Sequence, residues 1–374
     1  MTNTNPFITR GYVAPEYFCD REMETKMLTQ YLTNGNNVVL SAPRRIGKTG
    51  LIQHVFNQPS IAKEYYTFFV DIYPTKNYTE FVSTLGKSIL HTLKPIGKSA
   101  WDRFLSIVKS LRPNITYDAS GTPSLGISVD LSNHAPDTLE EIFSYLAQAD
   151  RPCIIAIDEF QTICNYPQKN IEAELRTFIQ HCPNAQFVFA GSRRHLLGEM
   201  FSDSRRPFYQ SCASMELSAI PLDKYIPFAK HHFEQAGKQI EPGTITSIYQ
   251  RYDGITWYMQ FILNTLYSCT NSGETCLPGD VDQAVRLILS QLDYNYRNTI
   301  FYLPSRQKEV LLAICNEGIA ENITSRPFMT RHHLTASTIQ GALRGLLEKD
   351  LVTEEFGKYQ VYDRFLAEWI QRNA

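Results

Sequence analysis

The chain has 374 residues, 43% of them hydrophobic, and a net charge of −2, which suggests two or three domains with sizeable cores and excludes a global basic field that would draw it to nucleic acid or anionic membranes. Its N-terminus is polar and no stretch is long and apolar enough to span a bilayer, so neither a signal peptide nor a transmembrane helix is predicted. The eight cysteines show no C-x-x-C and no paired Cys/His spacing of a zinc site, and we expect free thiols in a reducing cytoplasm.

The first predicted helix begins near Asp20, which can cap it, and continues to Tyr31. The apolar run 38–40 then leads into Ser-Ala-Pro-Arg-Arg-Ile-Gly-Lys-Thr over 41–49, and a helix-compatible stretch follows over 51–57. A strand, a tight loop, Gly-Lys-Thr and a helix form the arrangement that wraps a triphosphate, because N–H groups of the loop and the helix N-terminus point at the anion.

The phosphate-loop motif predicts a specific role for the Lys and for the Thr of the Gly-Lys-Thr sequence. Lys48 would reach the outer phosphates, and the hydroxyl of Thr49 would bind Mg²⁺. Ala42 stands where the usual motif has its first glycine, and we expect its single methyl to be accommodated. The alternative is a chance tripeptide on a surface turn. The residues predicted to bind the nucleotide here are Ala42, Pro43, Arg44, Arg45, Ile46, Gly47, Lys48, Thr49 and Gly50.

Several further elements are predicted before the next motif. Residues 66–71 favour a strand, and the apolar spacing in 81–90, and again from Phe104 to Leu111, favours helices. Residues 113–134 contain several prolines and glycines between short β-prone runs, which indicates an inserted hairpin or loop. A helix over 138–149 follows.

The second informative motif is an acidic pair at the end of a short apolar run. Residues 153–157, Cys-Ile-Ile-Ala-Ile, have the continuous hydrophobicity of a strand buried on both faces of a parallel sheet. Asp158 and Glu159 follow at its carboxyl end, where open α/β sheets bind ligands. Asp158 would hold Mg²⁺ and Glu159 would orient the attacking water. Capping of the next helix would account for the two acids but not for their partnership with Lys48 and Thr49, so we predict a P-loop NTPase.

The remaining elements divide the chain into three predicted domains. A helix over 171–180 and strands over 186–190 and 215–217 complete an α/β core with a parallel sheet, residues 1–220. Residues 221–302 show helical patterns and few strand signals, as in a helical lid domain. Residues 303–374 predict three helices, the third opened by Thr335 or Ser337, and a β-hairpin around 356–358, which is a winged-helix plan.

A set of short motifs resembles one family over most of the chain, from about Phe7 to Trp369. The motifs are Tyr17-Phe18-Cys19-Asp20-Arg21-Glu22, the double-Arg phosphate loop, Ile157-Asp158-Glu159-Phe160-Gln161, Gly191-Ser192, and a tail from Ala342-Leu343 through Leu351-Val352 to Tyr362-Asp363-Arg364-Phe365. On these residues the chain resembles archaeal-type AAA+ ATPases of the STAND group, the signal-transduction ATPases with numerous domains. The resemblance implies an ATPase core, a helical lid and a winged helix, with ATP and Mg²⁺ at the core–lid junction and nucleotide state controlling conformation or assembly.

The resemblance also implies roles for residues outside the two motifs. Tyr17 and Phe18 would lie near the adenine, although core packing explains such aromatics equally well. Ser192 takes the position of a polar sensor, or else is a local cap. Four arginines are candidates for contacting the γ-phosphate, and each can equally be a solvated surface residue: Arg193, Arg194, Arg205 and Arg206.

Other features of the resemblance leave alternatives open. Arg44 and Arg45 would cover the phosphates or face a partner domain. Related proteins often carry Gly-x-Pro in the lid, whereas this chain has Gly254-Ile255-Thr256, which leaves the contact between lid and nucleotide unassigned. Our assignment of catalytic roles is to Glu159, Lys48, Ser192 and Arg193.

Three functions are consistent with the sequence. The leading hypothesis is an ATP-binding, slowly ATP-hydrolysing and Mg²⁺-dependent switch that assembles with itself or with a protein partner. The second is a DNA-binding regulator, which the charge disfavours because the segment from Arg306 onward has nine Lys/Arg and nine Asp/Glu. The third is a scaffold that holds nucleotide without turnover.

Overall fold

The computed structural model describes residues 5–93, 111–117, 123–129 and 135–373. It divides into two compact units: unit 1 comprises Met1–Phe228 with Asp253–Phe261, and unit 2 comprises Ala229–Tyr252 with Ile262–Ala374. None of the helices in the described part of the chain has the length and apolarity needed to cross a membrane.

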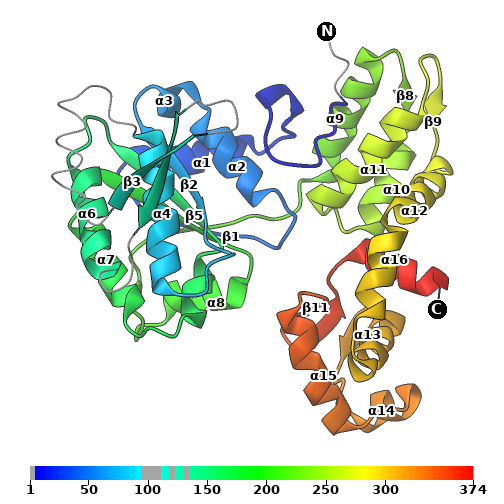
Figure 1. Ribbon diagram of the computed structural model, residues 1–374. Helices are drawn as coiled ribbons and strands as arrows, with labels where there is room; N and C mark the ends of the chain where they lie inside the picture. The colour runs from blue at the N-terminus through cyan, green and yellow to red at the C-terminus, as the bar shows by residue number, and fades with distance from the viewer. Residues whose placement is uncertain (1–4, 94–110, 118–122, 130–134, 374) are drawn as a thin grey trace. The chain divides into compact units, whose positions relative to one another are not determined.

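Unit 1 is built on a five-stranded parallel sheet with strand order β2-β5-β6-β1-β7 (Figure 1). The strands are β1 (Val38–Ser41), β2 (Tyr66–Asp71), β5 (Cys153–Asp158), β6 (Ala185–Gly191) and β7 (Ala213–Glu216). The predicted parallel α/β sheet is therefore confirmed. Strands that run in one direction bring their carboxyl ends to one edge, and the site residues lie along that edge.

Strand β5 shows why this sheet forms from continuous apolar runs. Its odd-numbered residues 153, 155 and 157 belong to one hydrophobic cluster, and Ile154 and Ala156 belong to another on the opposite face. Both faces are thus buried, as the sequence predicts. One face packs against helices α4, α6, α7 and α8, and the other against α1 and α2.

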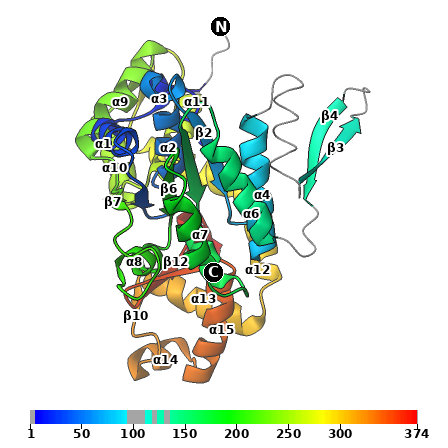
Figure 2. The ribbon, with the colours of Figure 1, turned by 90° about the vertical axis from the view of Figure 1, so that its left-hand side faces the viewer.

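The helices of unit 1 cover both faces of the sheet (Figure 2). They are α1 (Glu22–Thr33), α2 (Lys48–Phe56), α3 (Pro59–Ala62), α4 (Tyr78–Thr92), α6 (Ala135–Ala147), α7 (Ile171–Gln180) and α8 (Arg194–Ser202), with short 3₁₀ turns η1 (Pro15–Tyr17) and η2 (Phe160–Asn165). Helix α9 (Leu222–Gln235) begins in unit 1 and ends in unit 2. The predicted cap at Asp20 is wrong. Arg21 occupies the N-cap position of α1 in a left-handed conformation, with φ +67°, and no side chain caps the helix. The Arg21 guanidinium instead donates to Glu24 and to the carbonyl of Ser218.

The predicted insertion contains an antiparallel pair, β3 (Leu111–Tyr117) and β4 (Pro123–Val129), with Leu111 opposite Val129 and Tyr117 opposite Pro123. The predicted helix from Phe104 lies outside the described residues except for its last residue. That residue, Leu111, begins β3, so its assignment to a helix is wrong. Pro113, two residues later, suits an extended pair, because a proline disfavours helical conformation in the residue before it, which here is Arg112.

Unit 2 contains a helical part and a winged helix. The helical part includes α10 (Pro242–Arg251), most of α11 (Thr256–Cys269), α12 (Asp280–Phe301) and a short parallel pair of β8 (Gln239–Ile240) and β9 (Thr275–Cys276). The winged helix has α13 (Ser305–Glu317), β10 (Ala320–Glu321), α14 (Arg326–His332), α15 (Ala336–Glu348), β11 (Val352–Glu355), β12 (Lys358–Val361) and α16 (Arg364–Asn373). Its sheet has the order β10-β12-β11, and the predicted hairpin is confirmed.

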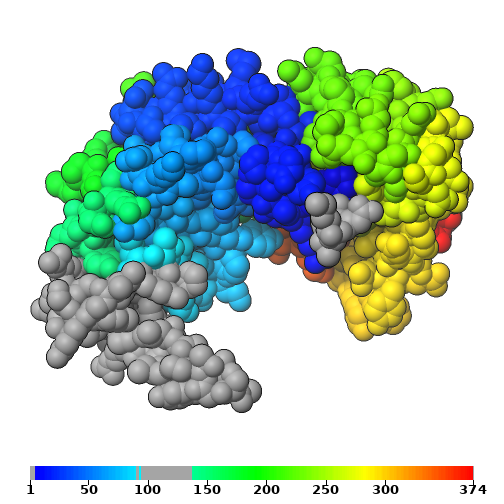
Figure 3. Space-filling model, turned by 90° about the horizontal axis from the view of Figure 1, so that it is seen from above, coloured from blue at the N-terminus to red at the C-terminus, as the bar shows by residue number. Residues whose placement is uncertain are grey.

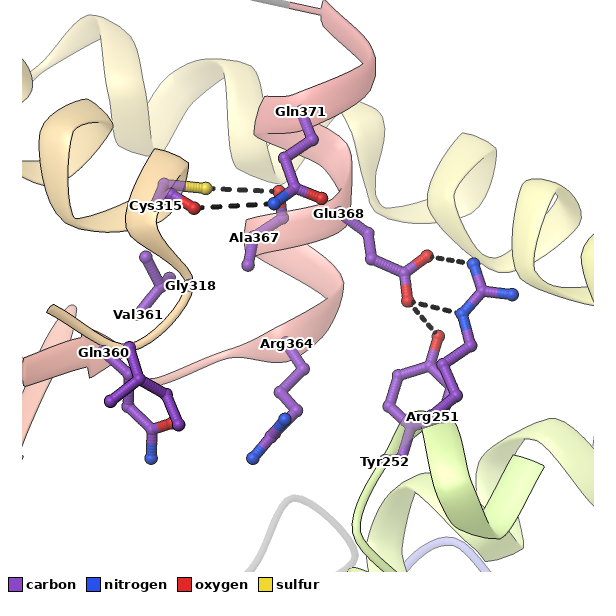
Figure 4. Close-up of a pocket in the computed structure, with 11 residues that line it drawn as sticks. Arg251, Tyr252, Cys315, Gly318, Gln360, Val361, Arg364, Ala367, Glu368 and Gln371 are labelled. Carbon is purple, nitrogen blue, oxygen red and sulfur yellow. Dashed lines mark hydrogen bonds and ion pairs between the residues drawn. The ribbon is translucent and has the colours of Figure 1, made fainter. Parts of the chain in front are cut away.

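A cavity of about 220 Å³ lies in unit 2 where α10, α13, β12 and α16 meet (Figure 4). At its side, Glu368 of α16 accepts two hydrogen bonds from the Arg251 guanidinium, at 2.9 and 2.6 Å, and one from the Tyr252 hydroxyl at 2.6 Å. Arg251 also pairs with Asp282 of α12 at 2.7 Å. These bonds tie the end of the winged helix to two helices of the helical part.

Candidate nucleotide-binding site

The phosphate loop connects β1 to α2, and two of its residues adopt left-handed backbone conformations. Gly47 has φ +102°, which glycine adopts without strain, and Arg45 has φ +67°. Ala42 is not among the residues with positive φ, and its N–H donates to the carbonyl of Gly191 at 3.2 Å. A methyl group at this position is therefore accommodated, as the sequence predicts. The turn that requires glycine lies at Gly47.

The two acidic motif residues meet the phosphate loop at the carboxyl edge of the sheet. The Nζ of Lys48 lies 2.7 Å from Oδ1 of Asp158 and 3.2 Å from Oε1 of Glu159. The Thr49 hydroxyl donates to Oδ2 of Asp158 at 2.9 Å. The structure thus brings together the four residues on which the predicted chemistry depends.

Glu159 has three polar neighbours besides its backbone. Its Oε2 accepts hydrogen bonds from the Gln161 amide at 2.5 Å and the Ser192 hydroxyl at 2.8 Å, and its Oε1 lies beside Lys48. Burial opposes the charge of Glu159, but the Lys48 ammonium and these hydrogen bonds outweigh it and hold the pKa of the carboxyl below its usual value. Glu159 is therefore an ionised carboxylate that is fixed in position.

Ser192 is linked to the phosphate loop as well as to Glu159. Strand β6 ends at Gly191, beside β1 and β5, so Ser192 follows at the same edge of the sheet. Its hydroxyl oxygen accepts a hydrogen bond from Nε of Arg44 at 3.2 Å. The guanidinium of Arg44 also lies over the ring of Tyr73, 5.6 Å from its centroid. Arg44 and Ser192 thus both lie at the acidic pair.

The segment 253–261 contacts the phosphate loop, although it is far away in sequence. The Thr256 hydroxyl donates to the carbonyl of Ile46 at 2.8 Å, and the Trp257 N–H donates to the carbonyl of Arg45 at 3.0 Å. The Arg45 guanidinium lies 4.3 Å from the centroid of the Trp257 ring and donates to the Tyr258 hydroxyl at 2.5 Å. This segment includes the Gly-Ile-Thr that departs from the Gly-x-Pro pattern. It binds the loop through Thr256 and Trp257.

The N-terminal aromatic residues lie against α2. The Phe18 ring stacks on His54 of α2, with centroids 4.2 Å apart, and its edge lies 3.5 Å from the position of a Cβ on Gly50. The Tyr12 hydroxyl is 3.0 Å from Nδ1 of His54. Burial lowers the pKa of His54. In the space-filling view this N-terminal segment is dark blue and adjoins the lighter blue residues that follow it (Figure 3). Tyr17 is half-buried in the turn just before Phe18.

The four candidate arginines have separate surroundings. Arg193 is an exposed residue at the N-cap position of α8. Arg194 pairs with Glu216 at 2.6 Å, Arg205 with Asp203 at 2.7 Å, and Arg206 with Glu172 at 2.7 Å. The three paired acids, Glu216, Asp203 and Glu172, lie outside the acidic pair of Asp158 and Glu159.

The residues at the sheet edge suit a polyphosphate with a divalent cation. Hydroxyl and carboxylate oxygens, as on Thr49 and Asp158, are the ligands that Mg²⁺ prefers. The Lys48 ammonium beside them supplies the cation that phosphate oxygens need. Sequence reasoning missed the roles of Gln161, Thr256, Trp257 and His54, because their contacts join segments far apart or depend on side-chain direction. Gln161 carried a local signal as the fourth residue of Asp-Glu-Phe-Gln, and Thr256 carried one as part of the Gly-Ile-Thr that stands in place of Gly-x-Pro.

Comparisons with known proteins agree with this geometry. A family profile described as an ATPase domain predominantly from Archaea matches residues 18–261, and a profile described as a probable winged helix domain matches residues 294–372. No curated protein matches the chain.

Among solved structures, the chain is similar to the Walker-type ATPase paby2304 of Pyrococcus abyssi, with 17% identity, a TM-score of 0.62, and coverage of 98% of this chain and 99% of that one. It is also similar to the Aeropyrum pernix ORC2 protein solved in ADPNP–ADP complexes, with 14% identity, a TM-score of 0.57, and coverage of 100% and 98%. The Aeropyrum pernix ORC1 protein in complex with DNA gives 14% identity, a TM-score of 0.55, and coverage of 96% and 94%. At these identities the likeness shows the fold.

The ATPase profile spans well over half of the chain and includes the phosphate loop, the acidic pair, Ser192 and the segment that contacts Arg45. The sheet order and the meeting of Lys48 and Thr49 with Asp158 fit that profile. The chain belongs to the family of ATPase domains found predominantly in Archaea, and it carries a winged helix domain after the ATPase domain.

Proposed function

We propose that the protein binds ATP with Mg²⁺ at the carboxyl edge of the unit 1 sheet and hydrolyses it slowly. The observation that carries the proposal is the convergence of Lys48 and Thr49 with Asp158 and Glu159, within 2.7–3.2 Å, from segments about 110 residues apart. A chance tripeptide on a surface turn has no reason to meet an acidic pair in this way.

In the proposed reaction the protein positions charges around the γ-phosphate. Lys48 moves from the carboxylates to the phosphate oxygens when nucleotide binds, because those oxygens carry more negative charge. Thr49 and Asp158 would hold the cation, which would supply positive charge to neutralise the phosphates. Glu159 orients a water for in-line attack and polarises it, while Ser192 and Arg44 complete the polar surroundings. Arg193 remains the proposed arginine contact to the γ-phosphate.

The test is the Glu159→Gln variant, which removes the carboxylate and keeps its shape. We expect ATP affinity within a few-fold of the unmodified protein and a loss of turnover of about 100-fold or more, the scale of one positioned proton-transfer group. Isothermal titration calorimetry measures the first quantity and phosphate release the second. Glu216→Gln, on the exposed side chain that pairs with Arg194, is the matched control and should keep both. Unchanged turnover in Glu159→Gln removes that residue from its role.

We further propose that the protein is a switch of the STAND type, in which bound nucleotide controls conformation or assembly. The proposed division is an ATPase core over 1–220, a lid over 221–302 and a winged helix over 303–374. The contacts of Thr256 and Trp257 with the phosphate loop support this, because they connect the start of α11 to the nucleotide-binding residues. Sizing the protein with ADP, with ATP and as Lys48→Ala should give a shift that depends on nucleotide and is absent in the variant.

A DNA-binding regulator is the second candidate, since a winged helix permits it and one structural neighbour was solved with DNA. The charge of the module speaks against it. Arg331 pairs with Glu317, and Lys358 with Glu321, at 2.6 and 2.8 Å, so these cations are already matched by acids. A gel shift with duplex DNA decides: tight, salt-sensitive binding favours the regulator.

A scaffold that holds ATP without turnover is separated from the leading proposal by the phosphate-release assay. A cytoplasmic location remains a prediction.

A further inference from the structure

Helix α12 carries a row of large apolar side chains that face outward. Leu287, Tyr294 and Phe301 are 41%, 74% and 79% exposed, and Tyr302 at the end of the helix is 78% exposed. The first three are spaced seven residues apart, so they lie along one face of the helix. Exposed apolar patches of this kind mark interaction sites far more often than scattered single residues do.

The opposite face of α12 is already used inside unit 2. Its buried residues are Val281, Ala284, Val285, Ile288, Leu289, Tyr296 and Ile300. Two further bonds attach this helix to α16 and to the residue just before it: the Trp369 indole donates to Asp293 at 2.9 Å, and the Tyr296 hydroxyl donates to Asp363 at 3.2 Å. The exposed row is therefore held on a fixed helix (Figure 1, yellow), with its direction set by packing on the other side.

The side chains that flank the row carry little charge. Gln283, Ser290 and Gln291 are exposed and uncharged. Of the exposed arginines there, Arg286 precedes Leu287 and Arg297 pairs with Asp293 on the same helix at 2.7 Å. Aromatic side chains with few charges around them are the composition of protein–protein interfaces. A DNA or membrane partner would require an excess of basic side chains, whereas Arg286 and Arg297 share this helix with the acids Asp282 and Asp293.

We propose that this face binds the same face of a second copy of the chain, with the two α12 helices antiparallel about a twofold axis at Tyr294. The spacing of the row is symmetric, since Leu287 and Phe301 each lie seven residues from Tyr294. An antiparallel pair centred there places Tyr294 against Tyr294 of the second copy and Leu287 against Phe301 of the second copy. A twofold contact of this kind uses one patch twice and closes on itself.

The same register leaves no like charges opposed. Residues equally far from Tyr294 face each other, so Ser290 opposes Asn298 and Gln291 opposes Arg297. Arg286 opposes Tyr302, a pair that suits a cation–π contact. Because this face pairs favourably with itself in one register, we favour a second copy of the chain over another apolar protein as its binding partner.

The size of the row predicts a weak dimer. Large aromatic side chains bury about 150–250 Å² each, so two copies of this row reach only the lower end of the roughly 1,200–2,000 Å² found in stable interfaces. We therefore expect a dimer that dissociates on dilution, and sedimentation velocity across a concentration series is the measurement.

A charge-swap experiment tests the register. Because residue 294 faces itself, Tyr294→Glu and Tyr294→Lys each place like charges together, and each should raise the dimer dissociation constant roughly tenfold or more. An equimolar mixture of the two variants should dimerise again, as Glu–Lys heterodimers. Tyr294 is largely exposed, so circular dichroism should show both variants folded. Phe356→Glu, at an aromatic residue on the wing that is 86% exposed, is the matched control and should not change dimerisation.

Three outcomes overturn the proposal. The first is an unmodified protein that stays monomeric at the highest concentration reached. The second is a dimer that either single variant leaves unchanged. The third is a mixture that stays monomeric although each variant is folded, which would place the interface elsewhere or in another register. None of these outcomes bears on ATP binding, so the proposed function is tested separately.

Discussion

Gly191 illustrates how one missing side chain supports the acidic pair. A Cβ placed on Gly191 would overlap Oε1 of Gln161 and lie 3.3 Å from Cδ2 of Leu197. Gln161 is 4% exposed, and its Nε2 donates to Oε2 of Glu159 at 2.5 Å. The Gln161 amide thus occupies the space that the glycine leaves. Glycine is required at position 191 because a larger residue would displace Gln161, which holds Glu159. The backbone angles do not require it, since Gly191 is not among the residues with positive φ.

This contact predicts the effect of Gly191→Ala. The new methyl group pushes the Gln161 amide off Glu159, and a hydrogen bond to a charged group contributes about 1.5–3 kcal/mol, so turnover should fall by roughly tenfold or more. The KM for ATP should change little, because Lys48 and Thr49 are not displaced. Steady-state phosphate release at several ATP concentrations separates the two quantities.

Two comparisons identify the cause. Gly198→Ala, on α8 where a Cβ meets nothing within 4 Å, should keep normal turnover. The double variant Gly191→Ala with Gln161→Leu should be no slower than Gln161→Leu alone, because the methyl group then has no amide to displace. Additive losses in the double variant would contradict the contact as the cause.

The depressed pKa of Glu159 makes a prediction about stability. A carboxyl whose pKa is lower in the folded state than in the unfolded chain stabilises the fold above the unfolded value of about 4.3. That stability is lost as the pH falls through the folded value. The unfolding free energy of the nucleotide-free protein, minus that of Glu159→Gln, should therefore decrease as the pH drops below about 4.3. Denaturant titrations from pH 7 downward measure it, and a difference independent of pH would contradict the assignment.

At the scale of the element, the segment 253–261 makes contacts that the sequence pattern does not predict. It contacts the phosphate loop through two backbone carbonyls, at Arg45 and Ile46, and through the Arg45 guanidinium. Arg45 has positive φ, an unfavourable conformation for a residue with a Cβ, and these contacts hold it there. The segment thus stabilises the loop in the shape it has in this structure.

Arg45→Ala should therefore loosen both the loop and the segment. The lost cation–π contact with Trp257 and the hydrogen bond to Tyr258 together contribute about 1–2 kcal/mol, so ATP affinity should fall by roughly five- to thirtyfold. Calorimetry measures the affinity, and amide hydrogen exchange in 253–261 should become faster. Arg151→Ala, which removes a cation–π contact 5.4 Å from the Tyr66 ring, is the matched control and should leave ATP affinity unchanged. Equal losses in both variants would show a general effect of removing charge.

The elements that the sequence predicted best are those whose signal is local. Strand β2 and helix α7 have the predicted bounds, and β5 extends one residue further to Asp158, because a buried strand requires a continuous apolar run and an amphipathic helix requires its own period. The choice between Thr335 and Ser337 is settled in favour of Thr335, whose hydroxyl accepts the N–H of Thr338. The predicted cap at Asp20 was wrong because Arg21 has tertiary partners that outweigh the local preference. The site was predictable in its two motifs and not in Gln161 or Trp257. The role of Gln161 depends on which way its side chain points toward Glu159, and Trp257 meets its partner Arg45 from a segment far away in the chain.

At the scale of the whole molecule, the winged helix does not form a compact unit by itself. Unit 2 joins it with residues 229–252 and with the helices from Ile262 onward. The joining contacts run through α16, which bonds to Arg251 at the end of α10 and to Tyr252 after it (Figure 4). Helix α16 also bonds to α12 at Asp293. Burial opposes the charge on Arg251, but its hydrogen bonds to Glu368 and Asp282 outweigh that and raise its pKa. Helix α16 therefore belongs to the helical part of unit 2 as much as to the winged helix.

Glu368→Ala tests this arrangement. It leaves Arg251 and the fully buried Tyr252 hydroxyl without their shared acceptor, which costs about 2 kcal/mol, or roughly a thirtyfold change in the local opening equilibrium. Because the bonds span three helices, amide exchange should accelerate together in α10, α12 and α16 and remain unchanged in strands β5 and β6 of unit 1. Glu348→Ala, which removes an exposed ion pair with Arg344 at 3.5 Å on α15, should change neither. Acceleration confined to α16 would contradict the arrangement, because it would show that the winged helix opens independently of the helices beside it.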